Sequence, residues 1–227
     1  MKKIILSLIF MAIAALCLVT CKKNPPQDVP DYSKRKPAIE LISASNWFNC
    51  AYIEWSYEDG QVFKKINIYK EDAGSKDFWL IAQTSTSNGM YMDENSQIQL
   101  HSERYYITGI TSEGIETVPS DTLSTVYLTI RRMENGWYEL SWNAYEDDAV
   151  VSYEIMRGED MRDPANKLAS VEPSVTRFVD RTPNENQPYY MIQYMMPWRH
   201  KIRGKYSTSP IPEWEYGQSN IVDCREL

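Results

Sequence analysis

The chain has 227 residues, and 31 acidic against 24 basic side chains give it a formal net charge of −7 at pH 7. An acidic chain lacks the basic surface on which nucleic-acid binding depends, so a general nucleic-acid function is excluded. Tyrosine (16 residues) and tryptophan (7) outnumber phenylalanine (5). Such an amphipathic aromatic bias suits exposed sheets, binding faces and β-sandwich cores.

The N-terminus has the form of an export signal. Lys2 and Lys3 precede an apolar run over residues 4–19, which is short for a membrane span of about 20 apolar residues. The run stops at Cys21 and the chain then turns polar. This pattern resembles a bacterial lipoprotein signal, and the resemblance implies that residues 1–20 are removed and that Cys21 carries the lipid. Thr20 departs from the small residue usual before that cysteine, so an ordinary cleaved signal or a short uncleaved anchor is the alternative.

Residues 21–36 are predicted to form a flexible tether, because prolines punctuate charged and polar residues that cannot build a core. Each buried CH₂ contributes about 0.8 kcal/mol, so two or more acyl chains on Cys21 would hold the protein on a bilayer durably. The expected partner is therefore the outer membrane. Some bacterial surface lipoproteins carry acidic residues after the cysteine, whereas Lys22 and Lys23 follow it here. This difference favours the periplasmic side over the cell surface.

Most of the remaining chain repeats at a fixed spacing of 87 residues. The matching pairs are Trp55 and Trp142, Ile66 and Tyr153, Ile68 and Ile155, Tyr91 and Phe178, and Asp93 and Asp180. Two copies of one sandwich-sized unit are the simplest explanation. We place the first copy at 37–124 and the second at 125–227, and we expect each to fold around its own core.

Alternation of apolar and polar residues at period two predicts strands throughout both copies, and helical periodicity does not compete with it. The strands are predicted at 50–55, 65–69, 79–82, 89–93, 105–110 and 120–127, and then at 137–142, 151–157, 168–171, 177–180 and 189–194. Turns are predicted at Asp59-Gly60, Glu113-Gly114 and Asn135-Gly136, the last being the strongest hairpin signal of the chain.

The order Leu-Ser-Trp (140–142), Tyr-Glu-Ile-Met-Arg (153–157), Phe-Val-Asp (178–180) and Tyr-Met-Ile (190–192) resembles a fibronectin type III domain. The first copy supplies the corresponding residues, and the whole chain resembles a Bacteroidetes-like lipoprotein with tandem domains of this type. The resemblance implies an all-β fold of two immunoglobulin-like sandwiches. It also implies that Trp55 and Trp142 are core residues and that Tyr105 and Tyr190 are the tyrosine-corner residues.

The second copy departs from the repeat by an insertion of about 14 residues, in a loop at about 195–218. This loop supplies the candidate binding residues, which are Trp198, Arg199, Lys201, Arg203, Lys205, Tyr206, Trp214 and Tyr216. Arginine and tryptophan are enriched at binding hot spots, aromatic faces can stack on sugar rings, and cations can meet carboxylates or sulfates. Alternatively, the loop packs over the junction around 123–128 and buries Trp198 or Trp214.

No metal site or cofactor is predicted. Cys50 and Cys224 lie in different copies and are expected to be free thiols, and His101 and His200 show no ligand spacing. The acidic run Glu146-Asp147-Asp148 falls at a predicted turn rather than forming a catalytic pair.

The sequence therefore predicts a non-catalytic, lipid-anchored envelope protein that acts as a binding or spacer module, with glycan or protein recognition through the long loop. One alternative is a structural subunit of an envelope complex that uses sheet edges for pairing. Glycoside hydrolysis is a distant third, because it would need paired carboxylates in a cleft.

Overall fold

The computed structural model describes residues 36–57, 63–85, 89–197 and 214–227. In these residues the chain is all-β, apart from the three-residue 3₁₀ helix η2 (Cys224–Glu226). The segment Tyr32–Leu227 forms one compact unit. The predicted fold class is confirmed.

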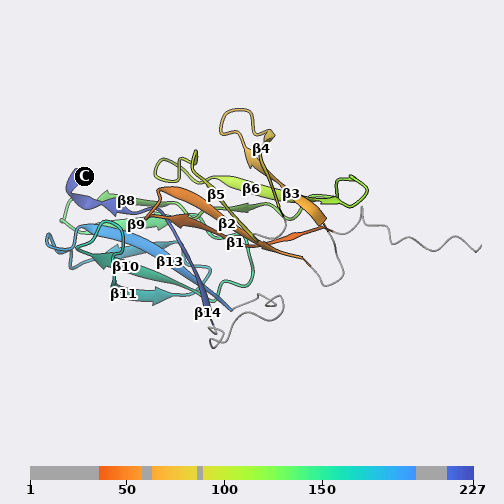
Figure 1. Cartoon of the computed structure of the whole chain (residues 1–227). Coiled ribbons are helices and arrows are strands. Elements are labelled where there is room, and N and C mark those ends of the chain that lie inside the picture. The colour runs from red at the N-terminus through yellow and green to blue at the C-terminus, as the bar shows by residue number, and fades with distance from the viewer. Residues whose placement is uncertain (1–35, 58–62, 86–88, 198–213) are drawn as a thin grey trace, which may run out of the picture. The chain divides into compact units, whose positions relative to one another are not determined.

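The first copy folds as two antiparallel sheets (Figure 1). One has the order β1-β2-β5 and the other the order β4-β3-β6-β7. The bounds are β1 (Ala38–Ser45), β2 (Cys50–Ser56), β3 (Phe63–Glu71), β4 (Phe78–Ser85), β5 (Met90–Asp93), β6 (Arg104–Thr111) and β7 (Leu123–Ser124).

The second copy repeats this arrangement. Its sheets have the orders β12-β9-β8 and β11-β10-β13-β14, and β15 also pairs with β13. The bounds are β8 (Leu128–Arg132), β9 (Tyr138–Trp142), β10 (Ser152–Gly158), β11 (Asn166–Val171), β12 (Arg177–Asp180), β13 (Tyr189–Pro197), β14 (Trp214–Gln218) and β15 (Val222–Asp223). Two tandem sandwiches of the fibronectin type III-like kind result.

The repeat extends to the register of the strands. Ile68 of β3 pairs with Ala82 of β4, and the register shifts at the next residue. Ile155 of β10 pairs with Ala169 of β11, and the register shifts at the equivalent point, 87 residues later. Bulges are specific features of a strand pair, so their match shows that the two sandwiches align residue by residue at this edge.

The predicted turns are confirmed where the structure describes them. Gly136 has a φ of +80° and joins β8 to β9, and Gly114 has a φ of +84° after β6. Both need the left-handed conformation that glycine adopts without steric cost. The turn predicted at Asp59-Gly60 lies outside the described residues.

Trp55 and Trp142 are buried, with 3% and 6% of their surface exposed, as core tryptophans should be. Tyr105 and Tyr190 are fully buried, but their hydroxyls differ from the family's tyrosine corner, which binds backbone. Both hydroxyls instead donate to aspartate side chains.

In the second sandwich Tyr190 donates to Asp180 Oδ2 at 2.7 Å. Arg157 Nη1 binds the same oxygen at 2.7 Å, and the Thr182 amide binds Asp180 Oδ1 at 2.8 Å. Burial alone would raise the pKa of Asp180. The hydrogen bonds from Tyr190 and Thr182 and the charge of Arg157 outweigh burial and lower it.

The first sandwich holds the equivalent cluster, with Lys70 and Asp93 at the positions 87 residues earlier. Lys70 Nζ lies 3.0 Å from Asp93 Oδ2 and 2.6 Å from the buried carboxylate of Glu103. Tyr105 lies between these carboxylates, 2.9 Å from Asp93 and 2.8 Å from Glu103. Each repeat thus ties its two sheets together with a buried ion pair, which the sequence alone did not reveal.

The two sandwiches are joined by tyrosines of the second that bind the edge strand β1 of the first. The Ile42 amide donates to the Tyr145 hydroxyl at 2.8 Å, and the Tyr194 hydroxyl donates to the Ile42 carbonyl. The rings of Tyr145 and Tyr194 stack at 4.6 Å. Next to them, the Gln218 amide donates to Ser43 Oγ at 2.8 Å.

Buried side chains of both sandwiches consequently form one continuous cluster. The expectation that each copy would fold around its own separate core is therefore not met. The physical reason is that β1 is an edge strand with backbone groups pointing away from β2, and the buried tyrosines satisfy them.

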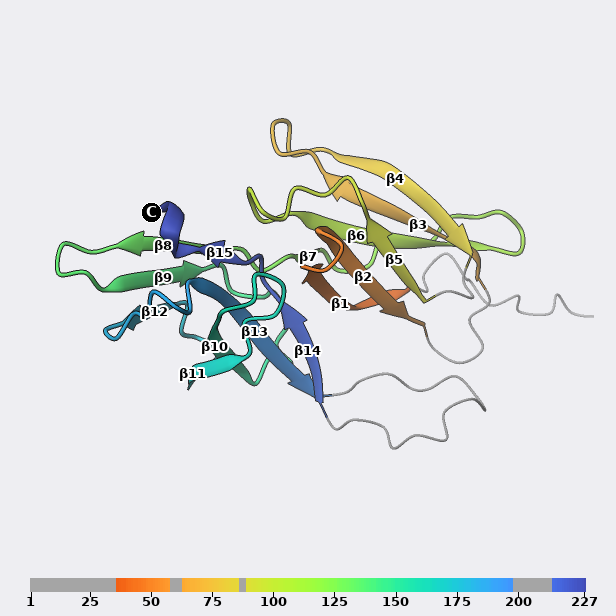
Figure 2. The ribbon, with the colours of Figure 1, turned by 60° about the vertical axis from the view of Figure 1, so that its left-hand side comes forward.

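Three differences concern strand limits. Strands β1 and β8 were not predicted, and the closing strand expected at 120–127 is paired only at Leu123–Ser124. Part of the loop expected at about 195–218 is strand, because β13 continues to Pro197 and pairs with β14 from Trp214 (Figure 2).

Candidate functional site

A groove of about 430 Å³ lies where the β1–β2 turn of the first sandwich meets the second sandwich. The first sandwich supplies Asn46, Trp47, Asn49 and Gln99. The second supplies Met161, Arg162, Tyr189, Ile221, Asp223 and Glu226. The lining combines side-chain amides, aromatic rings and charged groups, which is the composition of a site that binds a polar ligand with apolar faces.

The aromatic residues of this turn are exposed. Trp47 shows 63% of its surface and Phe48 shows 72%. The turn does not need them, since Asn49 provides the positive φ, at +52°. Arg162 of the second sandwich lies over the Trp47 ring at 5.3 Å from its centre, so a cation–π contact joins the two walls of the groove.

Asn46, a lining residue of the groove, is bonded across the junction to the second sandwich. Its Nδ2 donates to the Ser219 carbonyl at 3.0 Å and lies 3.5 Å from Gln218 Oε1. Gln99 Nε2 lies 3.5 Å from Asn46 Oδ1. These bonds order the amides that line the groove, and each amide oxygen can accept a second hydrogen bond.

Strand β14 connects the groove to the inserted segment. Tyr216 is 45% exposed and pairs with Met195 of β13, and Gln218 pairs with Gln193. Side chains two residues apart in a strand share a face and lie about 7 Å apart. Tyr216 therefore stands on the same face as Gln218, which adjoins Asn46.

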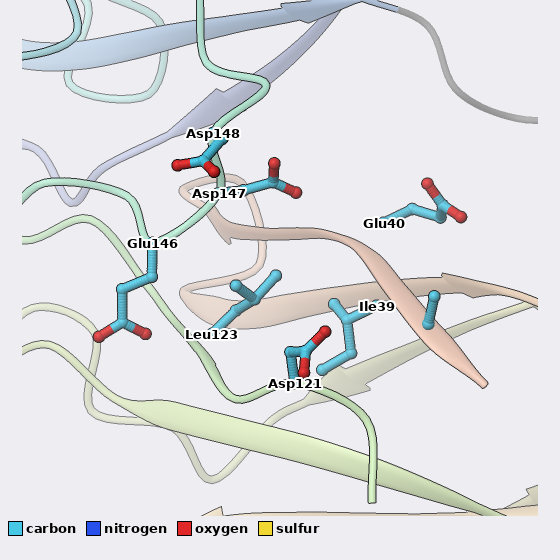
Figure 3. Close-up of a pocket in the computed structure, with 8 residues that line it drawn as sticks. Ile39, Glu40, Asp121, Leu123, Glu146, Asp147 and Asp148 are labelled. Atoms are coloured by element: carbon cyan, nitrogen blue, oxygen red, sulfur yellow. The ribbon is translucent and has the colours of Figure 1, made fainter. Parts of the chain in front are cut away.

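A second hollow, of about 470 Å³, is acidic (Figure 3). It is lined by Ala38, Ile39, Glu40, Asp121, Leu123, Glu146, Asp147 and Asp148. Figure 3 shows the carboxylates of Glu146 and Asp148 pointing away from that of Glu40. The hollow gathers negative charge at the junction without directing the carboxylates to one point.

Most of these carboxylates have partners of their own. Ser56 donates to Glu40, and Lys36 Nζ lies 2.6 Å from Asp121 Oδ1. The Ala149 amide donates to Asp147 Oδ1 at 2.8 Å. Within the described residues, no group of three or more histidine, cysteine or acidic side chains is arranged to hold a metal ion.

Most candidate binding residues of the inserted loop lie outside the residues that the structure describes. Trp198, Arg199, Lys201, Arg203, Lys205 and Tyr206 lie outside the described residues. Trp214 begins β14 and Tyr216 is exposed on it. Cys21 also lies outside the described residues.

Cys50 and Cys224 are both buried and unpaired, as expected. Burial raises the pKa of the Cys224 thiol to about 12, and it also raises the pKa of Cys50. A thiol of high pKa is a poor nucleophile at neutral pH, so neither cysteine has the environment of a reactive one.

Sequence reasoning missed Trp47, Asn46 and Arg162. A partial signal existed, because Trp47-Phe48 occupies a tight turn where small polar residues are usual. The pairing of Arg162 with Trp47 joins residues 115 positions apart, and only the packing of the two sandwiches brings them together.

In the part of the chain that the structure describes, no helix has the length and apolar character to cross a membrane. No protein-family model matches the chain, and no curated protein matches it.

Many solved structures are similar in part, and two of them serve as examples. The chicken interferon gamma receptor alpha chain is 11% identical, over 70% of this chain and 88% of that one, with a TM-score of 0.32. The FN1–FN3 domains of chicken CNTN1 are 15% identical, over 84% of this chain and 65% of that one, with a TM-score of 0.28. These identities and TM-scores are too low to support an inference about this chain. The fold assignment rests on the order of its strands.

Proposed function

We propose that the protein is a non-catalytic, lipid-anchored envelope protein whose joined sandwiches present a glycan-binding surface at their junction. The observation that best supports this proposal is the groove around Trp47. An exposed indole, three side-chain amides and an arginine surround it, and they come from both sandwiches. Indole faces suit the apolar faces of sugar rings, and amides offer the paired donors and acceptors that sugar hydroxyls need.

The joining of the sandwiches supports this function physically. Ile42 of β1 is held on its amide and on its carbonyl by tyrosines of the second sandwich. The two walls of the groove are therefore already held together before a ligand binds. This preorganisation lowers the entropic cost of binding. A rigid pair of sandwiches also suits a module that holds its ligand away from a membrane.

The inserted segment extends the proposed surface. Tyr216 shares a face of β14 with Gln218, which adjoins the groove at Asn46. We include Trp198, Arg199, Lys201, Arg203, Lys205, Tyr206 and Trp214 in the proposal as the residues that would lengthen the surface and give it positive charge.

The test is a glycan array probed with the chain from Lys22 onward, which contains the whole compact unit Tyr32–Leu227. We expect the wild-type chain to bind a defined set of glycans. Trp47→Ala should lose at least about tenfold in affinity, since an aromatic side chain that a ligand covers at a binding hot spot contributes about 2 kcal/mol or more, and tenfold corresponds to about 1.4 kcal/mol. Trp198→Ala and Trp214→Ala measure the part taken by the inserted segment.

Ile115→Ala is the matched control, because Ile115 is an apolar side chain of comparable exposure, 53%, that lies outside both the groove lining and β4. It should bind as the wild type does. Absence of binding to every acidic and neutral glycan would reject glycan recognition. Equal losses in Trp47→Ala and Ile115→Ala would reject the groove as the site.

The proposal also includes the lipid anchor, the localisation and the boundary between the two sandwiches. We propose acylation of Cys21, attachment to the outer membrane with the periplasmic side favoured, and a boundary between the sandwiches at residues 124 and 125. Cells that express the full chain should yield a mature N-terminus with a mass increase of several acyl chains. Cys21→Ala should abolish this increase. A mature protein that begins elsewhere would refute the anchor.

A further inference from the structure

Strand β4 is an edge strand that no other described strand covers. Figure 2 shows it as the outermost strand of its sheet, and β3 is its only partner among the described strands. Its eight residues, Phe-Trp-Leu-Ile-Ala-Gln-Thr-Ser, include no charge and no proline. Trp79, Leu80 and Ile81 are 62%, 52% and 36% exposed. A long apolar edge of this kind presents unpaired backbone groups to any other strand.

The equivalent strand of the second sandwich is an internal control. Leu80 pairs with Tyr69 one residue past the bulge, and Lys167 of β11 pairs with Met156 at the matching place. A lysine on an edge strand is a common device against edge-to-edge pairing. Lys167 also forms an ion pair with Glu154 at 2.9 Å. The same fold position is therefore protected in one copy and left apolar in the other.

The other sheet edges among the described strands are short, charged or covered. Strands β5 and β12 have four residues each and β7 has two. Strand β8 carries two arginines. Strands β1 and β14 cover each other, through the bond from the Gln218 amide to Ser43. The bare edge of β4 is thus the exception in this part of the chain.

The apolar surface continues from the edge onto the outer face of the sheet. Phe78 packs on Tyr106 at 4.8 Å between ring centres, and Tyr106 stacks on Tyr69 at 4.7 Å. Leu80 pairs with Tyr69 and so lies beside this aromatic row. A strand added to β4 would extend the sheet, and side chains on its outer face would lie beside Phe78 and Leu80.

The charges at the two ends of β4 indicate which strand could pair with it. At the N-terminal end of β4 the acidic Glu71, Asp72 and Asp77 outnumber Lys76. Lys70 also lies at this end, but Asp93 and Glu103 already neutralise it. At its C-terminal end Ser85 pairs with Lys65, which follows Lys64. In an antiparallel pair of two identical strands, the acidic end of one copy lies beside the basic end of the other. The edge is therefore complementary to itself.

We propose that β4 is the interface of a homodimer, in which two copies pair antiparallel across a two-fold axis near Leu80 to Ala82 and join their four-stranded sheets. The partner is a second copy of this chain. The groove around Trp47 belongs to other elements, so the dimer would present two copies of it.

The test is sedimentation of the chain from Lys22 onward over a wide concentration range. The wild type should be in equilibrium between monomer and dimer. Leu80→Lys, which copies Lys167, should raise the dimer Kd at least about 100-fold, because it places two cations near the axis. The second sandwich already carries a lysine at this position, so the variant should fold. Leu100→Lys is the control, since Leu100 is 67% exposed in a turn outside the strands.

A second measurement locates the interface. Cys50 and Cys224 are buried, so a cysteine placed at an exposed position is the reactive one. A short bismaleimide should cross-link Leu80→Cys as a dimer and leave Leu100→Cys monomeric. A monomeric wild type at the highest concentration would overturn the proposal. So would a dimer that Leu80→Lys leaves intact, or one that Leu80→Cys fails to trap.

Discussion

The bond between the Tyr194 hydroxyl and the Ile42 carbonyl is expected to stabilise both sandwiches together. Tyr194 is fully buried, and burial raises the pKa of its hydroxyl well above the ordinary value, so the proton remains available for donation. In Tyr194→Phe the ring can still stack on Tyr145, while the Ile42 carbonyl loses its partner. Leaving one buried acceptor unpaired costs about 1–3 kcal/mol.

We therefore expect Tyr194→Phe to lower the free energy of unfolding by about 1–3 kcal/mol, with each kcal/mol reducing Tm by about 2–4 °C in a chain of this size. Urea unfolding and calorimetry measure the two quantities. Tyr145→Phe removes the acceptor of the Ile42 amide, so the double variant should deviate from additivity by at least about 0.5 kcal/mol. Tyr216→Phe is the control, because Tyr216 is 45% exposed.

The decisive feature is cooperativity. If the buried cluster joins the sandwiches, the wild type should unfold in one transition and Tyr194→Phe should shift all of it. Two separate transitions in the wild type, of which Tyr194→Phe moves only that of the second sandwich, would refute the reasoning. A change below about 0.5 kcal/mol would refute it as well.

Three further predictions concern the buried groups. Asp180→Asn should cost about 3–5 kcal/mol at pH 7, because it leaves a buried arginine without its counter-charge. Since the pKa of Asp180 is lowered in the folded chain, its contribution is complete above about pH 4 and is lost as the pH falls further, so the cost should shrink in urea titrations on acidification. Gly217→Ala should destabilise the chain by about 1–3 kcal/mol or more in thermal unfolding, because an added Cβ would stand 2.0 Å from the Tyr194 ring; an unchanged Tm would contradict this packing. Cys50 and Cys224 should resist a thiol reagent at pH 8 until urea unfolds the chain, and rapid labelling of the native chain would show that they are not buried.

The fold class could be predicted because its signals are local and occur twice. Alternation at period two placed most strands of both copies, and the turns at Gly114 and Gly136 followed from glycine's freedom at positive φ. The core positions of Trp55 and Trp142 followed from the repeat. Strands β1 and β8 escaped prediction because the repeat offered no matching aromatic pairs in them.

The candidate site could be predicted only in part. The insertion in the second copy drew attention to the β13–β14 region, and Tyr216 is exposed there as a binding residue must be. The groove around Trp47 was missed, because its two walls come from sandwiches that contact each other through tertiary packing. Composition and spacing carry no information on that contact.

By itself the sequence determined the all-β class, the duplication and the core tryptophans, since these depend on side-chain polarity and on intervals along the chain. The tertiary structure alone decided that Tyr145 and Tyr194 bind the backbone of β1, that Trp47 meets Arg162, and that β4 lies at the edge of its sheet. Backbone donors and acceptors are the same at every residue. Their partners across a junction depend on how the sheets approach in space, and that is absent from a linear pattern.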